Sequence, residues 1–132
     1  MAQSLALTSF LVHDYDEAIT FFKRLHFEVL EDTRLSPEKR WIRVAPQGQS
    51  SSALLLARAV TLEQQTQVGK QAGGRVAFFL HTDSFWEYYD LLQDNGIRFV
   101  EAPRKEPYGM VVVFLDLYGN RWDLVETQAT TT

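Results

Sequence analysis

The stretch Asp116–Leu124, DLYGNRWDL, carries the strongest fold signal in this chain. Tyr118-Gly119-Asn120 within it has the composition of a tight turn, because Gly and Asn accept the backbone conformations that such turns require. A continuous apolar run, Met110–Leu115, precedes the turn, and a run of mixed polar and apolar residues, Arg121–Glu126, follows it. The stretch therefore predicts two β-strands joined by a short turn.

The residues before this stretch predict one more strand, a helix and a further strand. The strands are Arg75–His81 and Ile97–Glu101, and Thr82-Asp83-Ser84 opens the helix. Asn95-Gly96 has the composition of a left-handed helix cap. The apolar face of the helix is formed by Phe85, Tyr88, Tyr89 and Leu92. This half of the chain is therefore predicted as βαβββ.

The first half repeats the same order. Asp14 and Glu17 have the spacing of a capping box. The apolar positions that follow, Ala18, Phe21, Phe22 and Leu25, recur with helical spacing. The predicted strands are Leu5–Val12, Phe27–Glu31, Arg40–Ala45 and Ala53–Ala57. Val12 overlays Leu80 and Val44 overlays Phe114, an internal repeat with an offset of about 68 to 70 residues.

The repeat predicts an α+β fold and its domain organisation. Residues 1–132 form a single domain, with a first βαβββ module at 4–59, a Gln- and Gly-rich linker at 60–74 and a second module at 75–127. One such module leaves a half-buried sheet, which is not stable alone. We expect the two modules to form a curved sheet around a cleft, with the helices on the outer face.

Composition narrows the class of protein. Hydrophobic residues make up 45% and charged residues 23%, which is enough for a packed core. The net charge is −4 and no run of Lys or Arg exceeds two, so we expect neither nucleic acid nor a membrane as partner. The chain has no Cys, and Met1–Ser4 lacks the positive charge of a signal peptide. We expect a cytoplasmic globular domain with a frayed end at Thr130–Thr132.

The paired modules resemble the vicinal oxygen chelate superfamily, which includes glyoxalase I, bleomycin-resistance proteins and extradiol dioxygenases. Asp116–Leu124 is close to the superfamily's Asp-Pro-Asp-Gly-Asn-x-x-Glu-Leu signature. The other matching segments are Val12–Ala18 with Phe21-Phe22, Leu25-His26-Phe27, Val76-Ala77-Phe78 and Gly96–Phe99. His26 stands where the superfamily usually has a small Gly. The resemblance implies a small-molecule site and a homodimer, formed through edge strands or exchanged modules.

The resemblance also places the superfamily's four metal ligands on this chain. They fall at Leu7, Leu55, Arg75 (or Val76) and Asp123. A divalent metal needs several oxygen or nitrogen donors, and only Asp123 supplies one. We therefore predict no metal and no other cofactor, and glyoxalase or extradiol oxygenase chemistry is disfavoured.

Strand alternation predicts which side chains face the cleft. Leu7, Ser9 and Leu11 do so in the first strand, and Arg75, Ala77, Phe79 and His81 in the fifth. The predicted ligand-binding residues are Trp41, Arg43, Arg75, Phe79, Tyr108 and Asp123. A cationic ligand would bind Asp123 and a carboxylate would bind Arg43 or Arg75, and the sequence leaves both open.

Four alternatives remain. Asp123 is either a ligand contact or half of a structural ion pair with Arg75 or Arg43. The protein could be a metal-dependent lyase, isomerase or dioxygenase whose metal is held by His81, Asp123 and a third donor such as Glu126, with His81 and Asp123 the catalytic candidates. It could also be a structural or interaction module with a closed pocket. Trp86, which lies off the buried helix face, contacts either the ligand or a second subunit.

Overall fold

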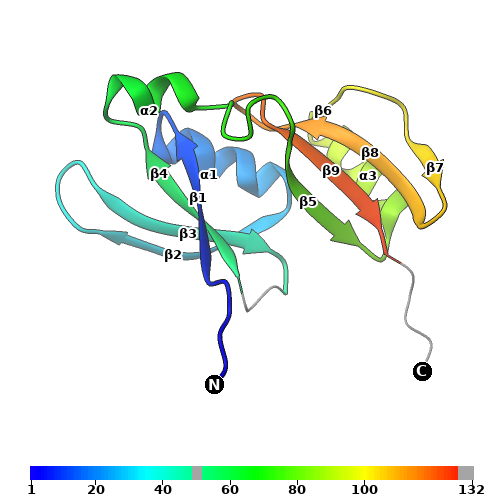
Figure 1. Cartoon of the computed structure of the whole chain (residues 1–132), viewed down its shortest axis with the longest axis horizontal. Helices are drawn as coiled ribbons and strands as arrows, with labels where there is room; N and C mark the ends of the chain where they lie inside the picture. Colours follow the sequence, from blue (N-terminus) through cyan, green and yellow to red (C-terminus); the bar gives the residue numbers. More distant parts are fainter. Residues whose placement is uncertain (49–51, 128–132) are drawn as a thin grey trace. The chain divides into compact units, whose positions relative to one another are not determined.

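The computed structural model describes residues 1–48 and 52–127 and divides the chain into two compact units. The first unit is Met1–Val68 and the second is Gly69–Thr132 (Figure 1). The division falls inside the predicted linker, where Leu62–Gln67 forms the short helix α2. The predicted frayed end, Thr130–Thr132, lies outside the described residues.

The first unit contains a mixed four-stranded sheet. Its elements are β1 (Leu7–Val12), α1 (Tyr15–Arg24), β2 (Phe27–Arg34), β3 (Arg40–Pro46), β4 (Ala53–Arg58) and α2 (Leu62–Gln67). The strand order is β1-β4-β3-β2. The first strand, β1, runs parallel to the last, β4, and the other pairs are antiparallel. The β2–β3 hairpin extends beyond its predicted length.

Helix α1 covers one face of this sheet (Figure 1). It begins as predicted, because the Asp14 carboxylate accepts a 2.8 Å hydrogen bond from the backbone N–H of Glu17. Phe22 of the helix meets Phe10 of β1 edge to face, with 5.1 Å between the ring centroids. The other buried side chains of this layer include Ala18, Leu25, Ile42, Val44 and Leu56.

The second unit contains a mixed five-stranded sheet. Its elements are β5 (Val76–Thr82), α3 (Phe85–Asp94), β6 (Arg98–Phe99), β7 (Arg104–Glu106), β8 (Gly109–Leu115) and β9 (Arg121–Glu126). The strand order is β5-β9-β8-β6, and β7 also pairs with β8. As in the first unit, the first strand is parallel to the last. The α+β fold with two βαβββ-like modules and two mixed sheets is thus confirmed.

The strand predicted at Ile97–Glu101 is shorter in the structure and is followed by one that was not predicted. β6 ends at Phe99, and β7 begins at Arg104 on the same partner strand. Pro103 lies between them and has no backbone N–H to contribute to a ladder. The carboxylate of Glu101 accepts the N–H of Val113 at 3.2 Å and takes the place of a backbone partner.

The Asp116–Leu124 stretch is held by one buried carboxylate. Asp116 accepts the backbone N–H groups of Tyr118 and Asn120, each at 3.0 Å. It also accepts the Asn120 side-chain amide and the Trp122 indole N–H, each at 2.9 Å. Burial raises the pKa of Asp116, and these four hydrogen bonds oppose the rise. The residue that dominates the sequence signature therefore stabilises a turn.

Each helix that packs on a sheet is followed by one residue in the left-handed backbone region. That residue is His26 after α1, with φ of 66°, and Gly96 after α3, with φ of 78°. The His26 side chain is exposed. The two modules therefore turn in the same way from helix to strand, but only the second uses a glycine.

Within residues 1–48 and 52–127, no helix is long and apolar enough to span a membrane.

Candidate functional site

Each unit has a hollow on its sheet. We call them the first pocket, of about 560 Å³, and the second pocket, of about 480 Å³. The residues that line the first pocket include Ser9, Leu11, Lys39, Trp41, Leu55 and Arg58. The second pocket is lined by Phe79, His81, Tyr108, Asp123, Val125, Glu126 and Thr127. Both volumes are typical of sites for small organic molecules, roughly 300–1,000 Å³.

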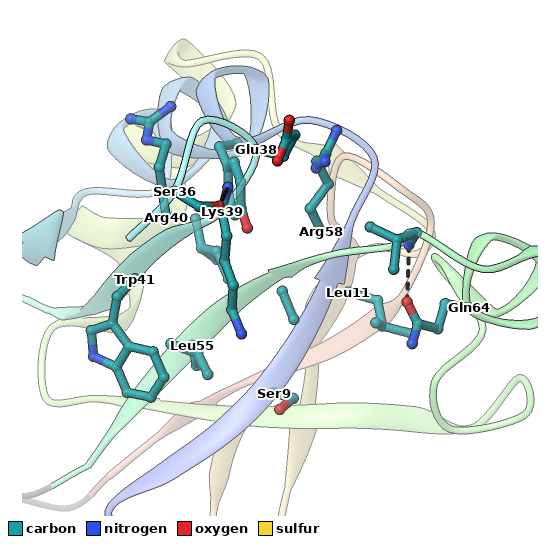
Figure 2. A pocket seen from close by; sticks show the side chains of 14 residues that line it. Ser9, Leu11, Ser36, Glu38, Lys39, Arg40, Trp41, Leu55, Arg58 and Gln64 are labelled. Carbon is teal, nitrogen blue, oxygen red and sulfur yellow. Dashed lines mark hydrogen bonds between the residues drawn. The ribbon is translucent and has the colours of Figure 1, made fainter. Parts of the chain in front are cut away.

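The first pocket has an apolar floor on the face of the sheet opposite α1. Leu11 of β1, Leu55 of β4 and Trp41 of β3 contribute to it. Phe10, which is buried between Ser9 and Leu11, points the other way because side chains alternate along a strand. Figure 2 shows the Trp41 indole and Leu55 at one end of the pocket, and Arg58, Glu38 and Gln64 at the other.

Two arginines of β3 are already paired with carboxylates. Arg40 donates to Asp32 at 2.7 Å and to Asp16 at 2.8 Å, and these bonds raise the pKa of Arg40. Arg43 donates to Glu31 at 2.9 Å and lowers the pKa of that carboxyl. Arg43, a predicted ligand contact, therefore forms an ion pair with β2 and is not part of the first pocket.

Arg58 differs from both. Its Nε is buried and has no hydrogen-bond partner, and no carboxylate of the described residues forms an ion pair with it. Arg58 is the last residue of β4 and lies opposite Val12. Sequence reasoning missed it, because alternation assigns it to the face that α1 covers. A charged residue at an apolar position was the available signal, since Arg is rarely buried without a partner.

The second pocket joins β5 and β9. Phe79 lies opposite Asp123 in this parallel pair, and His81 lies opposite Val125. The Phe79 side chain is 66% exposed, which is high for an aromatic ring of that size. Tyr108, in the turn between β7 and β8, is also exposed and lines the same pocket. Phe79, Tyr108 and Asp123 were predicted as ligand-binding residues, and the structure brings them together.

Asp123 has an unsatisfied carboxyl oxygen. Its Oδ1 is buried and has no hydrogen-bond partner. Burial raises the pKa of Asp123, an effect that the charge of Arg104 opposes and that of Glu101 reinforces. Arg104 itself donates to Glu101 at 3.2 Å and also to Glu106. Asp123 therefore offers a hydrogen-bond acceptor in an aromatic setting.

Arg75 lies outside this arrangement. It precedes β5, is exposed, and its backbone N–H donates to the carbonyl of Ala72 at 3.2 Å. β5 begins at Val76, which pairs with Arg121, the first residue of β9, so Arg75 has no partner position on β9. Among residues 1–48 and 52–127 no ion pair joins Arg75 to Asp123.

The side chains at the superfamily's ligand positions do not fit a divalent metal. Leu7 and Leu55 have no donor atoms, and Arg75 is cationic. The displaced set of His81, Asp123 and Glu126 lines one pocket, but the Glu126 carboxylate accepts the N–H of Met110 at 2.9 Å. In the described part of the chain, no three His, Cys, Asp or Glu side chains are grouped to hold a metal ion.

Comparison with known proteins identifies the family. Residues 4–124 match the family model described as Glyoxalase/Bleomycin resistance protein/Dioxygenase superfamily. The chain belongs to this superfamily. An uncharacterized protein of Shewanella frigidimarina (strain NCIMB 400) is 49% identical over 128 residues, which cover 96% of this chain and 95% of that protein.

Solved structures of the superfamily are similar over nearly their whole length. The crystal structure of UcmS2 has a TM-score of 0.81 and 29% identity, and the match covers 94% of this chain and 98% of that one. TnmS3, described as an antibiotic binding protein from Streptomyces sp. CB03234, has a TM-score of 0.75 and 25% identity, with 96% and 98% covered. The neighbours of this superfamily member thus include an antibiotic-binding protein.

Proposed function

We propose that this protein binds a small organic molecule on the open faces of its sheets and does so without the metal centre of the superfamily's enzymes. The observation that carries the proposal is the unpaired Oδ1 of Asp123 in a pocket that the exposed rings of Phe79 and Tyr108 also line. An unsatisfied buried acceptor costs about 1–3 kcal/mol, and a hydroxyl or amine of a ligand removes that cost.

Two further observations support the proposal. Large exposed aromatic side chains that line a hollow provide area for stacking, and aromatic pairs contribute about 0.5–1.5 kcal/mol beyond burial. The similarity to TnmS3 adds a structural neighbour that is described as binding an antibiotic. The donor set at the ligand positions supports binding without a metal, because Asp123 is the one carboxylate among them.

The test is a thermal-shift screen of aromatic compounds that carry hydroxyl or amine groups, followed by calorimetric titration of the hits. A compound at a hundred times its Kd should stabilise the protein by about 2.7 kcal/mol. The Asp123→Leu variant should bind hits about tenfold more weakly or worse, because the acceptor is lost. Glu87→Gln, an exposed change on α3, serves as the matched control and should bind normally. A folded wild-type protein that no compound stabilises would overturn the proposal.

We also propose that the protein is a homodimer, as the family resemblance implies. Trp86 of α3 supports a contact on that helix, since it is 52% exposed. Light scattering after size-exclusion chromatography should give twice the mass of the 15.2 kDa chain, and a monomer mass at micromolar concentration would contradict this.

A further inference from the structure

The first pocket contains cationic groups that the described structure leaves without partners. Arg58 forms no ion pair with the described residues, and its Nε is buried. Lys39, exposed at the start of β3, also lines the pocket and its ammonium group forms none of the ion pairs in the described residues. A buried guanidinium nitrogen without a hydrogen-bond partner is costly, so the site favours an occupant that accepts a hydrogen bond and carries negative charge.

The other charged side chains that line the pocket are Arg40 and Glu38. Arg40 is held in ion pairs with Asp16 and Asp32, which are not among the lining residues. Glu38 is the one acidic side chain among the lining residues, and Figure 2 shows it at the same end as Arg58. Glu38 forms no ion pair with Arg58 in the described residues. Among the charged lining groups that form no ion pair in the described residues, the two cations Lys39 and Arg58 exceed the one carboxylate, Glu38, by one charge, which fits a monoanion.

The apolar part of the pocket defines the rest of the ligand. The Trp41 ring, with Leu11 and Leu55, provides a surface for a flat hydrophobic group (Figure 2). A guanidinium binds a carboxylate or a phosphate through two parallel hydrogen bonds, and the excess of one cation over carboxylate among the unpaired lining groups favours the singly charged carboxylate over a phosphate dianion. The volume of about 560 Å³ has room for a ring system with an acidic group.

We propose that the first pocket binds an aromatic carboxylate, with its charged group on Arg58 and Lys39 and its ring against Trp41. This inference rests on the proposed function and names the class of ligand for the first unit. It assigns the charge preference to Arg58, a residue other than the two arginines that the sequence offered.

The test compares three probes that share one ring system: 2-naphthoate, its methyl ester and 2-naphthylmethylammonium. Binding is measured by calorimetry and by the change in tryptophan fluorescence. We expect 2-naphthoate to bind the wild-type protein about tenfold more tightly than the ester, since only the acid has a charge-assisted bond to gain. Arg58→Gln should abolish that difference, and Lys39→Gln should reduce it.

Two variants keep the test decisive. Arg43→Gln, a matched loss of one arginine outside the pocket, should leave the preference for naphthoate unchanged. Arg58→Lys keeps the charge and should retain part of the preference, so it replaces Arg58→Gln if that variant does not fold.

The possible contrary results fall into two groups, those that contradict only the carboxylate inference and one that also contradicts the proposed function. Equal binding of acid and ester, a preference that survives Arg58→Gln, or tighter binding of the ammonium probe would overturn the carboxylate inference. So would a wild-type protein that ignores all three probes but binds neutral compounds in an Asp123-dependent way. If no compound of any charge binds, both the inference and the proposed function are wrong.

Discussion

The two units have the same arrangement of strands and helix, but a different polar group lacks a hydrogen-bond partner in each. In both, the first strand pairs with the last and a helix covers one face of the sheet. The first unit has an unpaired arginine nitrogen, in Arg58, and the second has an unpaired carboxylate oxygen, in Asp123. The apolar layer under each helix is enough to define the repeated fold. The charged side chains on the opposite face of each sheet can therefore differ between the two units.

The largest expected effect concerns a network in the second unit. Replacement of Asp116 by Ala removes four hydrogen bonds from a buried turn. We expect the free energy of unfolding to fall by about 3 kcal/mol, because each unsatisfied buried donor costs about 1–3 kcal/mol. Chemical denaturation measures this, with the exposed Asp90→Ala on α3 as control. A loss below about 1 kcal/mol would show that water replaces the carboxylate.

The helix-to-strand turns give a paired comparison of the units. Gly96→Ala places a Cβ in the left-handed region and should cost about 1–2 kcal/mol. His26→Gly removes the same penalty from the first unit and should stabilise by at most about 1 kcal/mol, since glycine also adds entropy to the unfolded chain. His26→Ala, which keeps the Cβ, separates the backbone effect from loss of the imidazole. If His26→Ala stabilises as much as His26→Gly, the backbone explanation is wrong.

The ionisation of Asp123 predicts a pH dependence in the second unit. Its pKa in the folded state is raised above 3.8, mainly by burial, so the folded protein holds the proton more tightly than the unfolded chain. Stability from this group is full below pH 3.8 and is lost as the pH rises through the folded pKa. Asp123→Asn, which stays neutral, should match the wild type near pH 4 and be slightly more stable at pH 7, by less than about 1 kcal/mol.

Melting curves of the two proteins across this pH range measure the effect. The exposed Asp90→Asn should show no such trend. An Asp123→Asn variant that is less stable than the wild type at pH 7 would mean that the carboxylate forms a stabilising contact there.

The smallest expected effect is that of metal ions. Excess Ni²⁺, Zn²⁺, Mn²⁺ or Fe²⁺ should leave the melting temperature unchanged, since the ligand positions hold Leu7, Leu55, Arg75 and Asp123. Elemental analysis of protein purified without a metal-affinity tag should find no stoichiometric metal. One bound metal per chain with a raised melting temperature would restore an enzyme as the first hypothesis, and loss of that metal in His81→Ala would locate it.

The sequence predicted the structural features that depend on residues close together in the chain, such as helix caps. Asp14 caps α1 with the expected bond to Glu17, and Gly96 ends α3 in the expected conformation. Pairing between strands was harder to foresee. Arg43 meets Glu31 because of the register between β2 and β3, which no local pattern specifies. The β7 strand was missed because it is defined by its pairing with β8, which no local sequence pattern specifies.

The residues of the candidate site could be predicted only where side chains alternate regularly between the two faces of a strand. This alternation places Phe79 and Asp123 on one face, and they line one pocket. It fails at Arg58, the last residue of β4, where the sheet ends and a side chain can leave the face to which it belongs. It also fails at Arg75, which lies before β5 and has no partner position on β9.

The parallel pairing of first and last strands has a consequence for how the chain is made. During synthesis β1 emerges early, but its partner β4 begins only at Ala53, and β5 likewise waits for β9 at Arg121. Each unit must therefore close a long loop before its edge strand gains a partner, which slows folding relative to locally paired proteins. A nascent chain that stops short of β4 leaves the backbone of β1 unpaired, and the first unit becomes complete only when almost all of its residues have left the ribosome.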